Sequence, residues 1–264
     1  HPYGRPIIGW KHEIMELNYD DVKKFYKTHY EPRNAILVIS GDINLKKAKE
    51  IVKKNFSKIK NSNTSKFKET LDPNLNSQVF VEKKHSTVKQ DIWKKLYRAD
   101  SYNKSIKRGI ALDLGMKIIA GGTSSLLYDE FVNKKKIFSM IGGFYQGLSR
   151  GEGYIYFYAI PNEKIEPKKI DNLIMEQIKI LVKNELSLKR LETEKKKYFY
   201  DSIYRMDGIL KPSEIYGEAL TVGLTLSEVE NWNKNLDDIT LELVKKEMSK
   251  FIENKNYVIG SLQN

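Results

Sequence analysis

The sequence predicts an α+β fold in which a mostly antiparallel sheet has helices packed on one face. Strand-like and helix-like segments occur in clusters along the 264 residues rather than in strict alternation. Several strand-like segments alternate apolar and polar residues, as half-buried strands do. The 40% hydrophobic content is ordinary for a globular protein, and the length allows one large domain or two of modest size.

The first part of the chain predicts a helix, a strand and a second helix. Asn18 is a suitable N-cap for an amphipathic helix, and Pro32 ends that helix. The apolar run Ala35–Ile39 has the length of a strand, and Asn44 begins the second helix. His29, near the end of the first helix, is expected to be a half-buried structural residue.

A polar, turn-rich stretch separates this part from the rest of the chain. It begins with Asn61–Ser65 and continues to Asp72–Asn74, a composition typical of a connection between domains. We therefore place a domain boundary near residue 68, which gives a first domain of residues 1–67 and a second of residues 68–264.

The second domain is predicted to begin with two strands and two helices. Val79 and Val81 are flanked by the polar residues Gln78 and Glu82 in the first strand, and the second strand follows. Gly121 and Gly122 form a tight connection between the helices, with Thr123 or Ser124 as the cap of the second. The segments are 92–98 for the second strand, 105–119 for the first helix and 126–132 for the second helix.

The remaining segments are two strands, a helical region and a short final strand. Tyr154, Tyr156 and Tyr158 alternate and should share one face of a strand, where packing is a more usual role than ligand binding. The predicted strands are 138–144, 154–160 and 257–260. Four helices are predicted in this region. The first begins at Pro167, the second runs from 188 to 205, the third begins near Pro212, and the fourth runs from 236 to 251.

Charge and composition exclude several classes of protein. The formal net charge of +12 includes the runs Lys134–Lys136 and Lys195–Lys197, which fit solvated helix faces better than a nucleic-acid-binding stripe. An acidic peptide or an anionic membrane surface could still be attracted. The absence of cysteine excludes disulfides and thiolate metal sites. The sequence has no apolar run of about eighteen residues, so it predicts no transmembrane helix.

The histidines do not predict a zinc site in this chain. They are His1, His12, His29 and His85, and no two of them are spaced to share one helical face at i and i+4. The segment that starts at His12-Glu13 ends in Glu16, where a zinc-binding helix would need a second His. We expect no cofactor in this chain.

Three segments together resemble the insulinase/pitrilysin family of zinc metallopeptidases. They are His1–Gly9, similar to a segment that follows the metal-binding helices; Tyr97–Asp100, similar to Y-x-A-P; and Ala120–Tyr128, similar to L-G-G-G-x-S-S-R-L-Y. The resemblance covers nearly the whole chain. It implies two domains of related topology, of which residues 1–67 are the C-terminal part of a zinc-bearing type and residues 68–264 a second, non-catalytic domain.

The resemblance also points to candidate substrate-binding positions. Many relatives carry an Arg and a Tyr that clamp the substrate; here Val132 and Ser139 stand at those positions, and neither can replace them. Met140-Ile141-Gly142-Gly143-Phe144 resembles the family's substrate-anchoring strand, expected at a sheet edge. Two glycines would let a peptide backbone approach closely, although a glycine bulge without a ligand is an equal alternative.

We therefore expect part of an insulinase-like zinc metalloendopeptidase that encloses and anchors peptide substrates without carrying the zinc. Zinc would belong to the full-length enzyme or to a partner subunit. The implied partners are a peptide and the missing upstream domain or second half of a clamshell, as in a dimer, and family membership favours the periplasm. The alternative is a non-catalytic partner or scaffold subunit of a processing-peptidase-like complex. A nucleic-acid-binding protein is a third hypothesis, which the sequence disfavours.

Overall fold

The computed structural model describes residues 4–60, 73 and 75–264, and its chain divides into two compact units. Unit 1 comprises His1–Pro73 and Arg205–Thr221, and unit 2 comprises Asn74–Tyr204 and Val222–Asn264. The domain boundary that we predicted near residue 68 lies outside the described residues.

Unit 1 is helical in its described part. Asn18 begins α2 as predicted: its side chain accepts hydrogen bonds from the backbone N–H groups of Asp20 and Asp21, at 2.9 and 3.1 Å. The Asp21 carboxylate accepts from the Asn18 N–H in return, which completes a capping box. The helices are α1 (Lys11–Glu16), α2 (Tyr19–His29), α3 (Leu45–Phe56) and α8 (Lys211–Thr221), with a short 3₁₀ turn at Pro32–Asn34.

The predicted strand Ala35–Ile39 is wrong for this structure. Residues 35–40 have no regular secondary structure, and no described strand pairs with them. An apolar run becomes a strand only when a neighbouring strand supplies hydrogen-bond partners. The Ser40 hydroxyl donates instead to the carbonyl of Ile209, just before α8.

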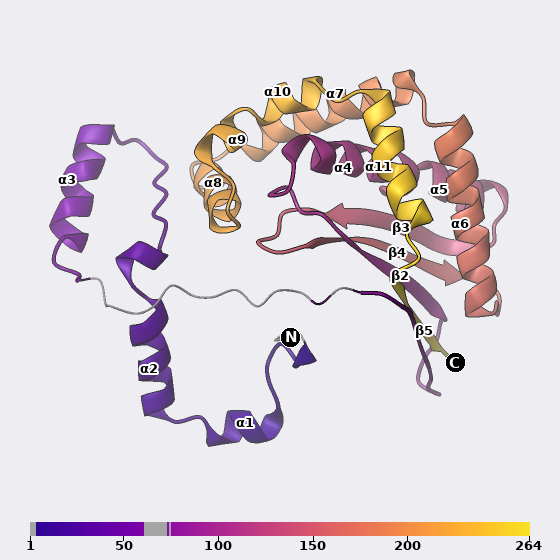
Figure 1. Ribbon diagram of the computed structural model, residues 1–264, viewed down its shortest axis with the longest axis horizontal. Helices are drawn as coiled ribbons and strands as arrows, with labels where there is room; N and C mark the ends of the chain where they lie inside the picture. Colours follow the sequence, from indigo (N-terminus) through magenta and orange to yellow (C-terminus); the bar gives the residue numbers. More distant parts are fainter. Residues whose placement is uncertain (1–3, 61–72, 74) are drawn as a thin grey trace. The chain divides into compact units, whose positions relative to one another are not determined.

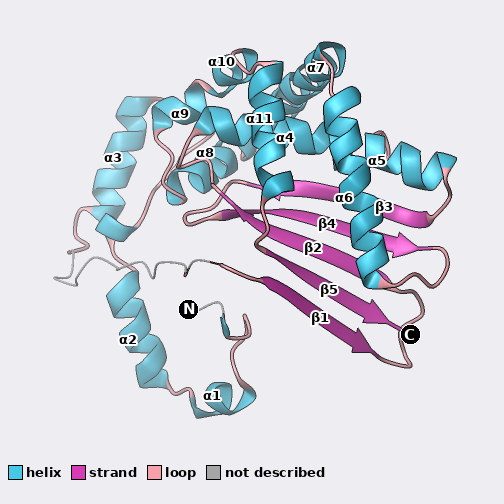
Figure 2. Ribbon diagram, turned by 45° about the vertical axis from the view of Figure 1, so that its right-hand side comes forward, coloured by secondary structure: helices cyan, strands magenta, loops and turns pink. Residues whose placement is uncertain are grey.

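Unit 2 contains a five-stranded sheet in the order β1-β5-β2-β4-β3 (Figure 2). Strand β1 runs parallel to β5, and the other three pairs are antiparallel. The prediction of a mostly antiparallel sheet is therefore confirmed. The strands are β1 (Gln78–Lys84), β2 (Ile92–Ala99), β3 (Phe138–Gln146), β4 (Gly153–Pro161) and β5 (Tyr257–Gln263).

Helices α4, α6 and α11 lie along one side of this sheet, also as predicted (Figure 1). Strand β4 shows the consequence: Ile155, Phe157 and Ala159 are buried, whereas the three alternating tyrosines are half-exposed on the other side, which we call the outer face. The helices of unit 2 are α4 (Ile106–Ala120), α5 (Leu126–Tyr128), α6 (Pro167–Asn184), α7 (Leu188–Arg205), α9 (Leu226–Glu230), α10 (Trp232–Asp237) and α11 (Leu241–Glu253), with a π-helical turn at Asp129–Lys134.

Two local predictions in unit 2 need correction. The cap of α5 is Ser125, not Thr123 or Ser124, because Gly122 turns the chain with φ +77° and Ser125 then accepts from the Tyr128 N–H at 3.4 Å. The predicted helix 236–251 is two helices, α10 and α11. Thr240 begins the second by accepting from the Leu243 N–H at 3.2 Å.

Candidate functional site

The candidate anchoring segment, Met140–Phe144, lies on β3 at one end of the sheet (Figure 2). Strand β3 pairs with β4, and no described strand pairs with its other side, which we call the free edge of β3. The expectation that this segment lies at a sheet edge is confirmed. An unpaired edge presents main-chain N–H and C=O groups to which another strand can add.

Gly142 lies directly opposite Tyr158 of β4. A Cβ atom on Gly142 would be 2.7 Å from the Tyr158 hydroxyl oxygen and 2.9 Å from the ring carbon that bears it. The Tyr158 ring therefore extends across Gly142 and covers it, which explains why this glycine is buried on an edge strand. The hydroxyl group of Tyr158 therefore lies above β3, although the residue belongs to β4.

Gly143 faces the opposite side of the sheet and is crowded by the core. A Cβ atom there would be 2.7 Å from the Phe157 ring and 2.7 Å from the Tyr156 carbonyl oxygen. The missing side chains of both glycines thus make room for residues of β4. This geometry supplies a packing reason for the two glycines that does not require a bound peptide.

The outer face of β3 is apolar on both sides of Gly142. Met140 is 47% exposed and Phe144 is 44% exposed, and they pair with Ile160 and Tyr156 of β4. The Phe144 ring packs against Tyr156 and Tyr154, with ring centroids 5.3 and 6.0 Å apart. These contacts hold an aromatic surface next to the free edge of β3.

The two positions that correspond to the family's clamp, Val132 and Ser139, are not brought into a polar site. Val132 lies half-buried in the π-helical turn. Ser139 is exposed on β3, and its hydroxyl donates to the Ile160 carbonyl at 3.2 Å. Neither side chain carries a charge or a phenol.

The described histidines lie apart from one another, and two of them have local contacts. His12 is exposed on α1, His29 is half-buried with its ring 4.4 Å from the Phe25 ring, and His85 Nδ1 lies 2.8 Å from the Thr87 hydroxyl. His1 lies outside the described residues. Across the described ranges, no three His, Asp or Glu side chains are grouped so that they could hold a metal ion. These residues do not fit the zinc that the family resemblance implies.

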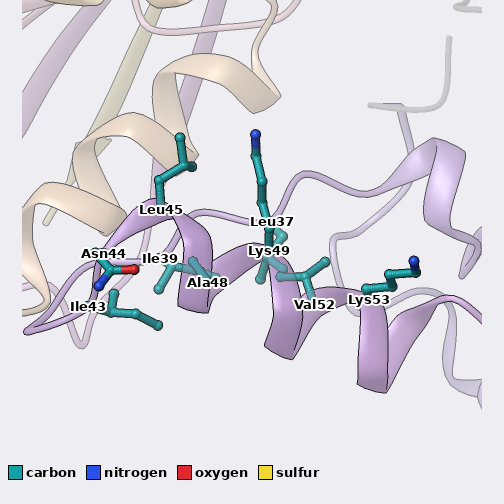
Figure 3. Close-up of a pocket in the computed structure, with 9 residues that line it drawn as sticks. All are labelled: Leu37, Ile39, Ile43, Asn44, Leu45, Ala48, Lys49, Val52 and Lys53. Atoms are coloured by element: carbon teal, nitrogen blue, oxygen red, sulfur yellow. The ribbon is translucent and has the colours of Figure 1, made fainter.

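Unit 1 has a separate apolar hollow of about 640 Å³, shown in Figure 3. Leu37 and Ile39 line it from the extended segment, and Ala48 and Val52 line it from α3. Its wall is mostly hydrocarbon, with Lys49 and Lys53 among the lining residues. It offers no arrangement of polar groups for chemistry.

Sequence reasoning treated Tyr158 only as part of a tyrosine face and did not identify its place above Gly142. Tyr158 pairs with Gly142 on one side and with Lys94 of β2 on the other. Lys94 is exposed and has no ion pair among the described residues. A glycine facing an aromatic residue on the next strand is a usable signal, but it requires the register between β3 and β4.

Comparisons with known proteins agree with this architecture. Residues 16–198 match the family model described as the peptidase M16 inactive domain. The zinc protease PqqE of Helicobacter pylori is 28% identical over 198 residues, which are 73% of this chain and 43% of that protein. The chain therefore spans less than half of this curated relative.

Solved structures show the same fold. The structure of a protease from Helicobacter pylori has a TM-score of 0.88 at 22% identity, over 100% of this chain and 63% of that one. The periplasmic protease PqqL from Escherichia coli has a TM-score of 0.74 at 14% identity, over 97% of this chain and 29% of that one. No described helix is long and apolar enough to cross a membrane.

The family model covers well over half of the chain, and the resemblance to the insulinase/pitrilysin metallopeptidases is confirmed. This chain belongs to the family of the peptidase M16 inactive domain.

Proposed function

We propose that this chain is a non-catalytic part of an insulinase-like zinc metalloendopeptidase, in which it helps to enclose peptide substrates and anchors them at the free edge of β3. The observation that carries the proposal is this unpaired edge with exposed Met140 and Phe144 beside it. An extended peptide would add there as a further strand.

Main-chain hydrogen bonds would supply most of the affinity in this mode, because every peptide has the same backbone groups. The glycines contribute indirectly. Gly142 and Gly143 let the side chains of β4 pack tightly against β3, so that the edge strand is held in place before the peptide arrives. The role of the segment is thus to bind and orient a substrate.

In this proposal, residues outside this chain cleave the peptide bond. Zinc, held by the full-length enzyme or a partner subunit, would activate water for peptide hydrolysis. The described residues of this chain supply neither a metal-binding group nor an Arg and Tyr at the clamp positions Val132 and Ser139. Its own contribution is to keep the peptide extended while another part of the protein acts on it.

The implied partners and compartment follow from the family. A protein built from two halves needs a second half or subunit, so we propose a dimer-like clamshell in which the other half carries the zinc. The matched Escherichia coli protease is described as periplasmic, which supports a periplasmic location for this chain.

Hydrogen exchange of backbone amides tests the anchoring role. The 264-residue chain is mixed with an extended peptide, and the exchange of β3 and β1 amides is compared, since both strands lie at sheet edges. We expect slower exchange confined to Phe138–Gln146. The same peptide with alternate amides N-methylated is the control, because it cannot donate the hydrogen bonds of an added strand.

Protection of β1 alone, or equal protection by the N-methylated peptide, would contradict anchoring at β3. Unchanged exchange of β3 with peptide, together with a stable complex between this chain and a zinc-bearing subunit, would favour the alternative function of a non-catalytic partner subunit.

A further inference from the structure

The row of residues that crosses the outer face of the sheet at Gly142 is different from the row beside it. Paired positions place Gly142, Tyr158, Lys94, Gly260 and Val81 in one row. The neighbouring row contains one residue from each strand and is apolar apart from its tyrosine hydroxyl: Phe144, Tyr156, Leu96, Val258 and Val79. The Gly142 row therefore places a phenol and a cation beside an apolar row.

The Tyr158 hydroxyl in this row is available to a ligand. It lies above Gly142, and no described group forms a hydrogen bond with it. Tyr158 is half-exposed, so the hydroxyl is not trapped in the core. A phenol can donate one hydrogen bond and also accept.

A peptide strand added at the free edge of β3 would meet this hydroxyl at one position. Residues of neighbouring strands that face each other lie on the same side of the sheet, with Cβ atoms about 5 Å apart. The peptide residue opposite Gly142 would find no side chain on β3, only the Tyr158 hydroxyl. The residues two places before and after it would lie beside Met140 and Phe144.

The charge nearby favours one kind of hydrogen-bonding side chain. Lys94 is directly paired with Tyr158 and is the only charged residue in these two rows, all of whose members are described. A carboxylate accepts a hydrogen bond from the phenol hydroxyl and is also attracted by the ammonium, whereas an amide has only the hydrogen bond.

We propose that Tyr158 determines the specificity of this edge, and that with Lys94 it selects peptides that carry an acidic residue opposite Gly142 between apolar residues two positions away on each side. This inference rests on the proposed anchoring at β3. It adds a sequence preference to a binding mode that otherwise depends on main-chain groups.

Affinity measurements with a matched peptide series test it. The peptides are extended, have Leu at both flanking positions, and differ only in carrying Glu, Gln or Leu at the central position. Binding to the 264-residue chain is followed by fluorescence anisotropy. We expect the Glu peptide to bind about tenfold more tightly than the Leu peptide, and this ratio to fall at high salt.

Three variants separate the contributions. Tyr158→Phe keeps the ring above Gly142 and should reduce the Glu-to-Leu ratio to about twofold or less. Lys94→Gln should reduce the difference in affinity between the Glu peptide and the Gln peptide. Tyr156→Phe is the matched control: it removes a hydroxyl from the next row of the same face and should leave both ratios unchanged.

Two failures can be distinguished. If peptides protect β3 from exchange but wild-type protein does not discriminate among them, or if Tyr158→Phe retains the full preference, the specificity role is wrong and anchoring stands. If no peptide protects β3, anchoring fails and the specificity role falls with it. The wild-type peptide series alone decides the preference should a variant fold poorly.

Discussion

The Lys95 ammonium of β2 donates a hydrogen bond to the Asp171 carboxylate of α6 at 2.7 Å. The Lys95 side chain is only 2% exposed and that of Asp171 13% exposed, so this ion pair joins the sheet to a covering helix away from water. The Lys95 nitrogen also lies 3.8 Å from the centre of the Tyr257 ring. Strands β2 and β5 and helix α6 therefore meet at one buried cation.

Asp171→Ala should destabilise the protein by about 3 kcal/mol, because it leaves the Lys95 ammonium buried without its counter-ion. The double variant Lys95→Met/Asp171→Ala should recover most of this loss, since the unpaired charge is removed as well. Urea unfolding monitored by tryptophan fluorescence measures both. Equal destabilisation of the single and double variants would show that the charge is not the cause.

The same pair predicts a pH dependence. Burial lowers the pKa of Lys95 below 10.5, despite the opposing effect of the hydrogen bond and charge of Asp171. In the pH range between the lowered pKa of Lys95 in the folded protein and its value of 10.5 in the unfolded chain, the unfolded chain binds more protons. The free energy of unfolding therefore increases as the pH rises through this range. Wild-type protein should gain stability relative to Lys95→Met over that range. A pH-independent difference in free energy of unfolding would contradict this.

Gly143→Ala should destabilise unit 2 by about 2 kcal/mol, because the new methyl group would contact the Phe157 ring and the Tyr156 carbonyl. Gly260→Ala is the matched control, since a Cβ at that strand position meets nothing within 4 Å. Thermal unfolding of both variants checks the difference. A Val at Gly142 or Gly143 would disturb the fold in the same way, so a weaker substrate affinity in such a variant would not by itself report on anchoring.

The 264-residue chain should not retain zinc at a stoichiometric level after dialysis. Its described histidines lie on separate segments and form no group that could hold a metal ion, and convergent ligands are needed for tight binding. Metal analysis of the dialysed protein measures this. Stoichiometric zinc that is lost in His12→Ala or His29→Ala would overturn the prediction.

Unit 1 should promote self-association through its apolar hollow. Leu37 is 56% exposed and Ile39 is 45% exposed, and apolar surface of this kind is usually covered. Sedimentation velocity should show species larger than a monomer that diminish in Leu37→Glu. Lys46→Gln changes the charge by the same amount on an exposed position of α3 outside the hollow, and should have no effect. A monomer at all concentrations would contradict the prediction.

Local chemistry made much of the fold predictable from sequence. Asn18 and Asn44 cap helices as expected because a short polar side chain before an apolar pattern satisfies the free N–H groups of a first helical turn. The alternation of tyrosines with other residues along β4 correctly predicted which side chains share a face of that strand. Helix α7 begins at Leu188 and ends at Arg205, the bounds that were predicted.

Long-range pairing was not predictable in this way. The run Ala35–Ile39 has the composition of a strand, but its conformation depends on partners that a local pattern does not contain. The proximity of Tyr158 to Gly142 depends on the register between two strands, and a shift of one residue would move the tyrosine to the helix-covered face. The candidate strand was therefore identified from sequence, whereas the side chain that distinguishes it was not.

Strand β5 lies inside the sheet, between β1 and β2, although it follows the other four strands in the sequence. During synthesis the antiparallel strands β2, β4 and β3 can pair as soon as they leave the ribosome. Strand β1, which precedes the other four strands in this sequence, has β5 as its only neighbour among the described strands and must wait for residues 257–263. Until residues 257–263 emerge, a nascent chain thus leaves unpaired the edges of β1 and β2 that β5 later joins, which makes this interval the time when chaperone protection of the sheet matters most.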